Sequence, residues 1–386
     1  MTETATATPT PDALASVLAN APFVRLVATD DGDAVAAAGT LAGALRERAV
    51  PFQARVSRDP HPDAGEDEVA VTVGTDAGPH SIPATSRPAS TTAFAVAREL
   101  GVEADPVVTL AGGVAAGSVP GTDGTGDALE AAERAGSVAR RPGLAIPCAD
   151  LADGLAASTL LRTPYSGDPE AARATLAELD LPSALDDDAH RRLASLVAVD
   201  VAAAEGASDR APAGVERALR PYAIGESAAA PFETVGGYAD VLDALAREEP
   251  GTGIALALSD DPGDGLVTAA RDTWREHGLA THRALDTATT SRYDGCLVVR
   301  VDAPPSTLPT IARITRDFRS PEPVVAVLDE SSDRVAAAAT EPTGLGDICR
   351  SVAAELGGDG WGTDDCGGIE PNADPTDALA ALREAL

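Results

Sequence analysis

Short apolar runs alternate with alanine-rich stretches in the first hundred residues, and this alternation constrains the fold most. Residues 23–28 (FVRLVA) form an apolar run typical of a buried parallel strand. An acidic turn at 29–33 follows. The pattern predicts strands and helices in alternating order: strands at 23–28, 51–56 and 68–74, and helices at 34–49 and 90–100. This spacing indicates a parallel, doubly wound α/β sheet.

The remaining residues predict a helical middle and a second α/β region. Predicted helices lie at 154–161, 168–179, 184–205, 263–278, 308–318, 344–356 and 375–386, and predicted strands at 253–258, 295–301, 323–329 and 334–339. A length of 386 residues fits two domains. We therefore expect a disordered tail (1–20), a first domain (21–206), a helical connector (207–230) and a second domain (231–386), with a cleft between the domains.

The charge of the chain indicates its surroundings more than its ligand. The sequence has 29 basic and 61 acidic residues, a net charge of −32, and every basic residue is Arg. An acidic surface of this kind is expected of a protein in a salt-filled cytoplasm, where exposed charges are strongly screened. A nucleic acid would then have to be held at local Arg sites. No apolar run reaches 18 residues, so we expect a cytoplasmic protein with no membrane partner.

The acidic turn after the first strand is the first candidate site. Asp31 and Asp33 are alternate carboxylates near the carboxyl end of a predicted parallel strand, where open α/β sheets bind ligands. Two such carboxylates can converge on one hard cation. Equally, Asp residues in such a turn can be solvated and cap the following helix.

This turn resembles the first motif of the DHH-family phosphoesterases, the RecJ-like proteins, which reads HxDxDGxxSA after a strand. Two registers are open. One aligns Asp31 and Asp33 with the two motif aspartates, and Thr29 replaces the His. The other aligns Asp31 and Gly32 with the Asp-Gly pair, and Thr29 replaces the first Asp. Asp31 is common to both, and the His is absent from both.

A glycine-rich stretch near the C-terminus extends the resemblance. Residues 357–369 (GGDGWGTDDCGGI) are similar to the GGGHxxAAG signature of the DHH-associated C-terminal domain, whose backbone N–H groups contact phosphate. Thr363 stands where the signature has His, and the other matching residues are Gly360, Gly362, Cys366, Gly367 and Gly368. Segments 150–159, 164–168 and 235–245 also resemble family segments. The resemblance implies a DHH-like parallel-sheet domain and a smaller DHH-associated C-terminal domain.

The remaining catalytic motifs depart from the family. Active members bind two metal ions, usually manganese, through several Asp and His. Here Gly74 follows the strand at which the second motif has Asp, with Asp76 two residues on; His80 alone lies where Asp-His-His is expected. A strand expected at 107–113 ends in Gly rather than Asp. The ligands that remain are Asp31, Asp33 and Asp76, fewer than two cations need. We expect no cofactor, or Mn²⁺ or Mg²⁺ if this residual site functions.

The resemblance also implies a role. The eukaryotic helicase cofactor related to RecJ is inactive and joins GINS and MCM, and archaeal RecJ-like proteins associate with GINS. We therefore expect a catalytically degenerate binding or scaffold component of DNA replication or repair. Two alternatives stay open. One is an active metal-dependent single-strand exonuclease or small phosphoesterase that uses Asp31, Asp33 and Asp76; the other is an RNA- or ribosome-linked binding protein.

Arginines and glycines of the last third are the candidate contacts for single-stranded DNA or RNA. Arg313, Arg316 and Arg319 recur every three residues on a predicted helix, and Arg can grip phosphate with two N–H groups. The predicted phosphate-binding residues are Arg313, Arg316, Gly362, Thr363, Gly367 and Gly368. The structural alternative is that these arginines favour a helix C-terminus and pair with nearby carboxylates.

Overall fold

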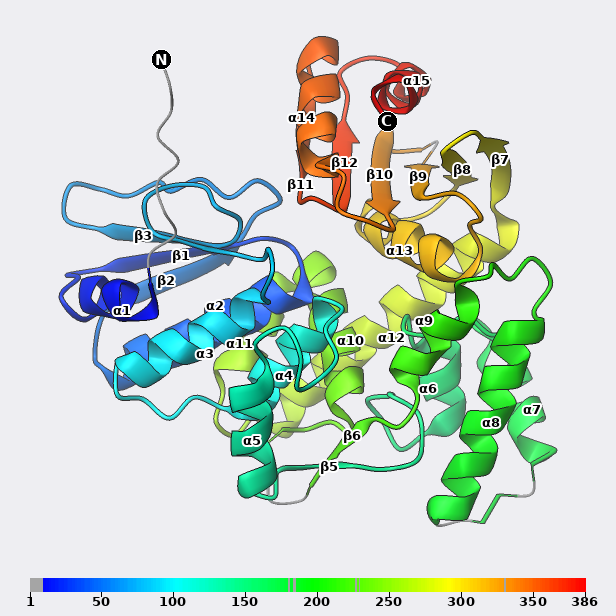
Figure 1. Ribbon diagram of the computed structural model, residues 1–386, viewed down its shortest axis with the longest axis horizontal. Coiled ribbons are helices and arrows are strands. Elements are labelled where there is room, and N and C mark those ends of the chain that lie inside the picture. Colours follow the sequence, from blue (N-terminus) through cyan, green and yellow to red (C-terminus); the bar gives the residue numbers. More distant parts are fainter. Residues whose placement is uncertain (1–9, 180, 183–184, 226–227, 229, 330) are drawn as a thin grey trace. The chain divides into compact units, whose positions relative to one another are not determined.

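The computed structural model describes residues 10–179, 181–182, 185–225, 228, 230–329 and 331–386. The chain forms two compact units, each assembled from separate stretches of sequence. The first consists of Met1–Arg141, Ala145–Cys148 and Pro221–Trp274, and the second of Pro142–Leu144, Ala149–Arg220 and Arg275–Leu386. Each unit has its own sheet and helices (Figure 1), which confirms the predicted class of two α/β domains.

The main sheet of the first unit is parallel, with strand order β2-β1-β3-β4. Its strands are β1 (Val24–Ala28), β2 (Phe52–Val56), β3 (Val69–Gly74) and β4 (Ser81–Pro83). Ala28 lies in register with Val56 on one side and Val73 on the other, so β1, β2 and β3 end at the same edge. The strands predicted at 23–28, 51–56 and 68–74 are confirmed.

Helices rich in small residues pack on this sheet and on one another. They are α1 (Pro11–Ala19), α2 (Gly32–Glu47), α3 (Ala89–Glu99), α4 (Pro106–Ala115), α5 (Gly126–Arg134), α10 (Val235–Glu248), α11 (Pro250–Leu258) and the first part of α12 (Asp264–Thr287). Strands β5 (Val138–Arg140) and β6 (Tyr222–Ile224) form a small separate sheet. Close approach explains the glycine in the middle of α2, because a β-carbon on Gly39 would lie 2.4 Å from that of Ala257.

Three predicted segments of the first unit differ from the structure. Part of the tail predicted at 1–20 is helix α1, which begins at a proline and buries Leu14 and Leu18; residues 1–9 lie outside the described residues. The predicted strand at 253–258 is helix α11, and the strand expected at 107–113 is helix α4. Short apolar runs do not separate a buried strand from a buried helix, and in both cases a proline starts the helix.

The compact units do not follow the predicted domain boundaries. Residues 221–274 belong to the first unit, although the sequence pattern placed them in the connector and the second domain. The physical reason is that α10 packs against α2 and α4. The segment predicted as a connector (207–230) contains helix α9 (Ala211–Ala218) and strand β6.

The second unit is built around a six-stranded sheet with strand order β11-β12-β10-β9-β8-β7, parallel only between β8 and β9. Its strands are β7 (Thr289–Tyr293), β8 (Cys296–Val301), β9 (Val324–Asp329), β10 (Arg334–Ala339), β11 (Asp359–Gly362) and β12 (Cys366–Glu370). The glycine-rich stretch therefore forms a β-hairpin of β11 and β12.

Alternate side chains of this sheet form two cores, one on each face. Helices α14 (Leu345–Leu356) and α15 (Pro375–Ala385) cover one face, and α13 (Leu308–Phe318) with the end of α12 covers the other (Figure 1). The remaining helices of the unit are α6 (Leu151–Ala157), α7 (Pro169–Ala177), α8 (Asp187–Ala203), α9 and the short 3-10 turn η1 (Pro305–Thr307). Among the described residues, no helix is both long and apolar enough to cross a membrane.

Candidate functional site

The carboxyl ends of β1 and β3 are where this sheet would bind a ligand. From β1 the chain passes through α2 to β2 on one side, while β3 lies on the other side of β1. A change of direction of this kind opens a crevice at the strand ends, which is the usual ligand site of open α/β sheets. Thr29 follows β1 and Gly74 ends β3, so these two residues lie at the same end of adjacent strands.

Thr29 fills the space beside Gly74. A β-carbon built on Gly74 would lie 1.9 Å from the Thr29 hydroxyl oxygen, and Gly74 has a φ of +90°. The Thr29 amide donates to the carbonyl of Val73 at 2.9 Å. Consequently there is no room for a side chain at Gly74, the position at which the family resemblance leads one to expect an Asp.

Asp31 is the N-cap of α2. Its carboxylate accepts a hydrogen bond from the Ala34 amide at 2.9 Å and another from the Thr29 hydroxyl. Burial raises the pKa of Asp31, and the charge of Asp243 raises it further. The cap explains why a helix starts directly after the acidic turn, since Asp at this position satisfies an amide that the helix leaves unpaired.

Asp33 has other partners. Its side chain is buried and accepts hydrogen bonds from the amides of Ala89, at 2.5 Å, and Ser90, at 3.0 Å, which begin α3. Burial, and then the charge of Asp31, raise the pKa of Asp33 to about 7. The structure thus joins Thr29 to Asp31 and directs Asp33 to the start of a different helix.

The donors present do not fit a two-metal centre. Asp76 is exposed in the loop after β3, and Gly113 lies inside α4. The carboxylates of Asp31 and Asp33 each accept backbone amides. Among the described residues no group of three or more His, Cys, Asp or Glu is placed to hold a metal ion. Two cations need more oxygen and nitrogen ligands than this arrangement supplies.

Two residues of α10 complete the site, and neither was predicted from the sequence. The carboxylate of Asp243 accepts a hydrogen bond from the Gly32 amide at 3.2 Å. Arg247 Nη1 lies 2.6 Å from the same carboxylate, and both side chains are almost buried. We call Asp30, Asp31, Asp243 and Arg247 the strand-end cluster. An Asp–Arg pair four residues apart on a helix is a recognisable signal, but it does not reveal that this helix packs over the first turn of α2.

Arg58 adds a second cation beside this site. It follows β2, and its Nε lies 3.7 Å from a carboxylate oxygen of Asp30. Both side chains are partly exposed, so this is a weak, screened ion pair.

The glycines of the β11–β12 hairpin allow it to pack closely on α14. A β-carbon on Gly360 would lie 2.4 Å from the carbonyl oxygen of Cys349, and one on Gly367 would lie 2.7 Å from the Cys349 sulfur. A β-carbon on Gly368 would lie 2.6 Å from the ring of Trp361. The glycine pattern therefore has a packing explanation that needs no phosphate.

The turn of this hairpin also occupies the start of α14. The Gly346 amide donates to the Thr363 carbonyl at 2.7 Å, and the Leu345 amide donates to the Asp364 carbonyl at 3.1 Å. The Thr363 hydroxyl donates to Asp365 at 3.0 Å. The amides of Leu345 and Gly346 at the start of α14 are thus bonded to the hairpin turn.

The predicted arginines of α13 also have internal partners. Arg313 donates to the Thr159 hydroxyl at 2.7 Å, and Arg316 donates to Asp317 at 2.7 Å and to the Ala339 carbonyl at 3.1 Å. These bonds tie α13 to its surroundings in the second unit. Contact of Arg313, Arg316 and the hairpin residues Gly362, Thr363, Gly367 and Gly368 with nucleic acid stays a prediction.

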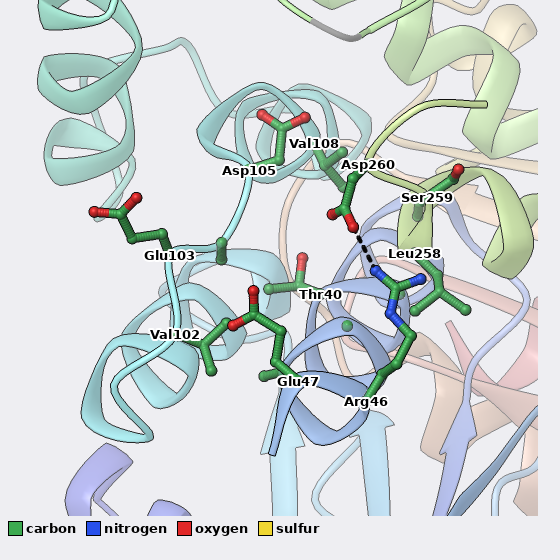
Figure 2. Close-up of a pocket in the computed structure, with 15 residues that line it drawn as sticks. Thr40, Arg46, Glu47, Val102, Glu103, Asp105, Val108, Leu258, Ser259 and Asp260 are labelled. Atoms are coloured by element: carbon green, nitrogen blue, oxygen red, sulfur yellow. Dashed lines mark hydrogen bonds and ion pairs between the residues drawn. The ribbon is translucent and has the colours of Figure 1, made fainter. Parts of the chain in front are cut away.

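A small pocket of the first unit lies apart from all the predicted site residues. Figure 2 shows it between α2, the loop before α4 and the end of α11. Its volume is about 40 Å³. Arg46 and Asp260 form an ion pair at its edge at 2.7 Å. A volume of this size suits a few ordered waters.

Solved structures with a similar fold include CDC45 and RecJ proteins. CDC45 from Entamoeba histolytica has a TM-score of 0.59 and 10% identity, covering 97% of this chain and 98% of its own. RecJ from Thermus thermophilus, in complex with Mg²⁺, has a TM-score of 0.51 and 13% identity over 97% of this chain. This chain spans 52% of the length of that RecJ. These likenesses show that the fold is the two-domain fold of RecJ-like DHH proteins.

Sequence comparison gives a much closer relative. The chain is 47% identical over 382 residues to "Uncharacterized protein rrnAC1427" of Haloarcula marismortui, covering 97% of this chain and 96% of the relative. Residues 288–384, which span β7 to α15, match the family described as "Uncharacterized protein rrnAC1427, C-terminal domain". The chain therefore belongs to the rrnAC1427 family, and it has the fold of RecJ-like DHH proteins.

Proposed function

We propose that this chain is a RecJ-like protein without a two-metal hydrolytic centre, and that it acts as a binding or scaffold component of DNA replication or repair. The contact between Thr29 and Gly74 carries the proposal, because the Thr29 hydroxyl occupies the volume in which the side chain of a metal-binding Asp is expected. The second support is that Asp31 and Asp33 cap two different helices.

The chemistry of phosphoester hydrolysis explains why these features matter. Two metal ions activate the attacking water and stabilise both the attacking and the leaving oxygen, so the ligands must surround both ions at once. Thr29 offers a hydroxyl group and Gly74 a hydrogen atom, so neither side chain supplies a negative charge for binding a metal ion. We therefore assign no hydrolytic step to the strand-end cluster.

Support for a scaffold role comes from the likeness to CDC45, which extends over almost the whole length of both chains. By the family resemblance, the partners proposed for this chain are GINS and MCM, and single-stranded DNA or RNA is its proposed ligand. A fold of this size retained without the metal centre is suited to presenting surfaces to other proteins.

Manganese titration tests the loss of the metal centre. Calorimetry with Mn²⁺ in molar KCl would be run on wild type, on Asp31→Asn and on the exposed control Asp63→Asn, with cleavage of single-stranded DNA and RNA assayed on the same samples. We expect no stoichiometric binding and no cleavage. Binding and cleavage by wild type, both lost in Asp31→Asn and kept in Asp63→Asn, would make the protein a metal-dependent exonuclease instead.

Complex formation tests the scaffold role. Purified GINS and MCM proteins from the same source would each be mixed with this chain in molar KCl and analysed by size-exclusion chromatography with light scattering. We expect a complex of defined stoichiometry with at least one of them. The absence of any complex across a range of salt would contradict the proposed role in replication.

A further inference from the structure

In the strand-end cluster, Asp243 lies beside the turn that carries Asp30 and Asp31. Asp30 and Asp31 lie in the turn after β1, and Asp243 reaches the same turn from α10 through its hydrogen bond with the Gly32 amide. A β-carbon on Gly32 would lie 2.9 Å from the backbone nitrogen of Asp243, so α10 and the start of α2 are in direct contact. Carboxylates so confined repel one another unless a cation lies among them or protons neutralise them.

The buried cation beside these carboxylates is the guanidinium of Arg247, whereas Arg58 pairs with Asp30 at the surface. Arg247 Nη1 contacts the Asp243 carboxylate at 2.6 Å and donates to the Asp243 carbonyl at 2.7 Å. The Arg247 and Asp243 side chains are only 12% and 13% exposed. Burial alone would lower the pKa of Arg247, but the charges of Asp243, Asp30 and Asp31 outweigh it and raise the pKa above its ordinary value. The guanidinium is therefore permanently charged and held against the cluster.

A guanidinium and a divalent cation differ in what they offer. Both neutralise carboxylates, but only the metal has open coordination positions at which water is activated. We propose that Arg247 supplies to the strand-end cluster the positive charge that a divalent cation would otherwise supply, so that the first unit keeps its strand-end geometry without a bound metal. This inference rests on the proposed loss of the metal centre. It identifies the Arg247 guanidinium as the group that takes over the structural role of the metal.

Thermal unfolding of the full chain in molar KCl tests the proposal, with EDTA, Mn²⁺ or Mg²⁺ added. The variants are Arg247→Met and the control Arg46→Met, whose ion pair with Asp260 is exposed. Wild type is expected to unfold at the same temperature in EDTA and in millimolar Mn²⁺. Arg247→Met is expected to lose roughly 5–10 °C in EDTA and to regain part of this with Mn²⁺, whereas Arg46→Met shifts by about 2 °C or less and does not respond.

A second variant keeps the test decisive if Arg247→Met fails to fold. In Arg247→Met/Asp243→Asn one carboxylate of the cluster is removed with the guanidinium, so this double variant is expected to unfold at a higher temperature than Arg247→Met. Two results would overturn the proposal: an Arg247→Met protein as stable as wild type, or a destabilised one that neither Mn²⁺ nor Asp243→Asn rescues. Cleavage of nucleic acid by wild type would contradict the proposed function, whereas the unfolding temperatures of the variants test the role of Arg247. The failure of one proposal can therefore be distinguished from the failure of the other.

Discussion

The hydroxyl oxygen of Thr29 lies 1.9 Å from the point at which a β-carbon of residue 74 would stand, and residue 74 is a glycine with a φ of +90°. Thr29 follows β1 and Gly74 ends the adjacent parallel strand β3, so side chains at these two positions would compete for one volume at the sheet edge. In this arrangement the Thr29 side chain occupies that volume, and residue 74 has none.

Restoring the expected aspartate should destabilise the protein. Gly74→Asp combines a positive φ with a steric overlap, and we expect it to lower the free energy of unfolding by about 3 kcal/mol. Gly117→Asp is the control: Gly117 has a φ of +86° and no atom within 4 Å of the position a β-carbon would take, so only about 1 kcal/mol should be lost. In Thr29→Ala, the cost of Gly74→Asp should shrink. Equal costs in both backgrounds, measured by thermal unfolding, would contradict the steric explanation.

Asp33 should make stability depend on pH. Burial and the charge of Asp31 raise its folded-state pKa from 3.8 to about 7, so the folded protein binds the proton more tightly than the unfolded chain. The stabilisation is complete below about pH 4 and is lost as the pH rises toward 7. Between pH 4 and pH 7, the free energy of unfolding of Asp33→Asn should therefore fall by up to about 4 kcal/mol less than that of wild type. Unfolding temperatures of wild type, Asp33→Asn and Asp76→Asn from pH 4 to 8 would check it; parallel profiles for wild type and Asp33→Asn would refute it.

Local sequence patterns were sufficient to predict the strands β1, β2 and β3 of the first sheet, but not the residues of the site at their ends. The runs at β1, β2 and β3 are bounded by turns, so their positions could be predicted. The run at α11 was assigned to a strand, because a short apolar run does not separate a buried strand from a buried helix. Asp243 and Arg247 were missed because the partner of Asp243 at Gly32 is 211 residues away, and no spacing within either segment records that contact.

We expect the buried side chain of His282, in the second unit, to lower the free energy of unfolding at acidic pH. Its Nε2 lies 2.9 Å from the Ser158 carbonyl and its Nδ1 3.3 Å from Arg162, which fits a neutral ring that donates to Ser158 and accepts from Arg162. Burial, and then Arg162, lower its pKa to about 3. The folded state thus resists protonation, and stability is lost as the pH falls from about 6.5 toward 3. NMR titration should show the His282 ring neutral at pH 5; a charged ring at that pH would contradict the assignment.

The glycines of the β11–β12 hairpin should be required for packing. A β-carbon on Gly360 would lie 2.4 Å from a backbone oxygen, so Gly360→Ala should cost about 3 kcal/mol or more. Gly357→Ala is a matched control three residues away, with a φ of +73° and open space, and should cost about 1 kcal/mol. Thermal unfolding compares the two. A Gly360→Ala protein that is as stable as Gly357→Ala would reopen a ligand-binding explanation for the glycines.

Arg313 allows structural and nucleic-acid roles to be separated. Its guanidinium donates to the Thr159 hydroxyl and carbonyl, so Arg313→Ala should lower the free energy of unfolding by about 1–2 kcal/mol. A phosphate contact predicts a further effect: the slope of log affinity for single-stranded DNA against log salt should fall by about 0.7, since one fewer counterion-releasing contact remains. Thr159→Ala is the control, because it removes the internal hydroxyl acceptor and leaves the charge in place. A reduced slope in Arg313→Ala but not in Thr159→Ala would support contact with nucleic acid, whereas destabilisation with an unchanged slope would limit Arg313 to holding α13 in position.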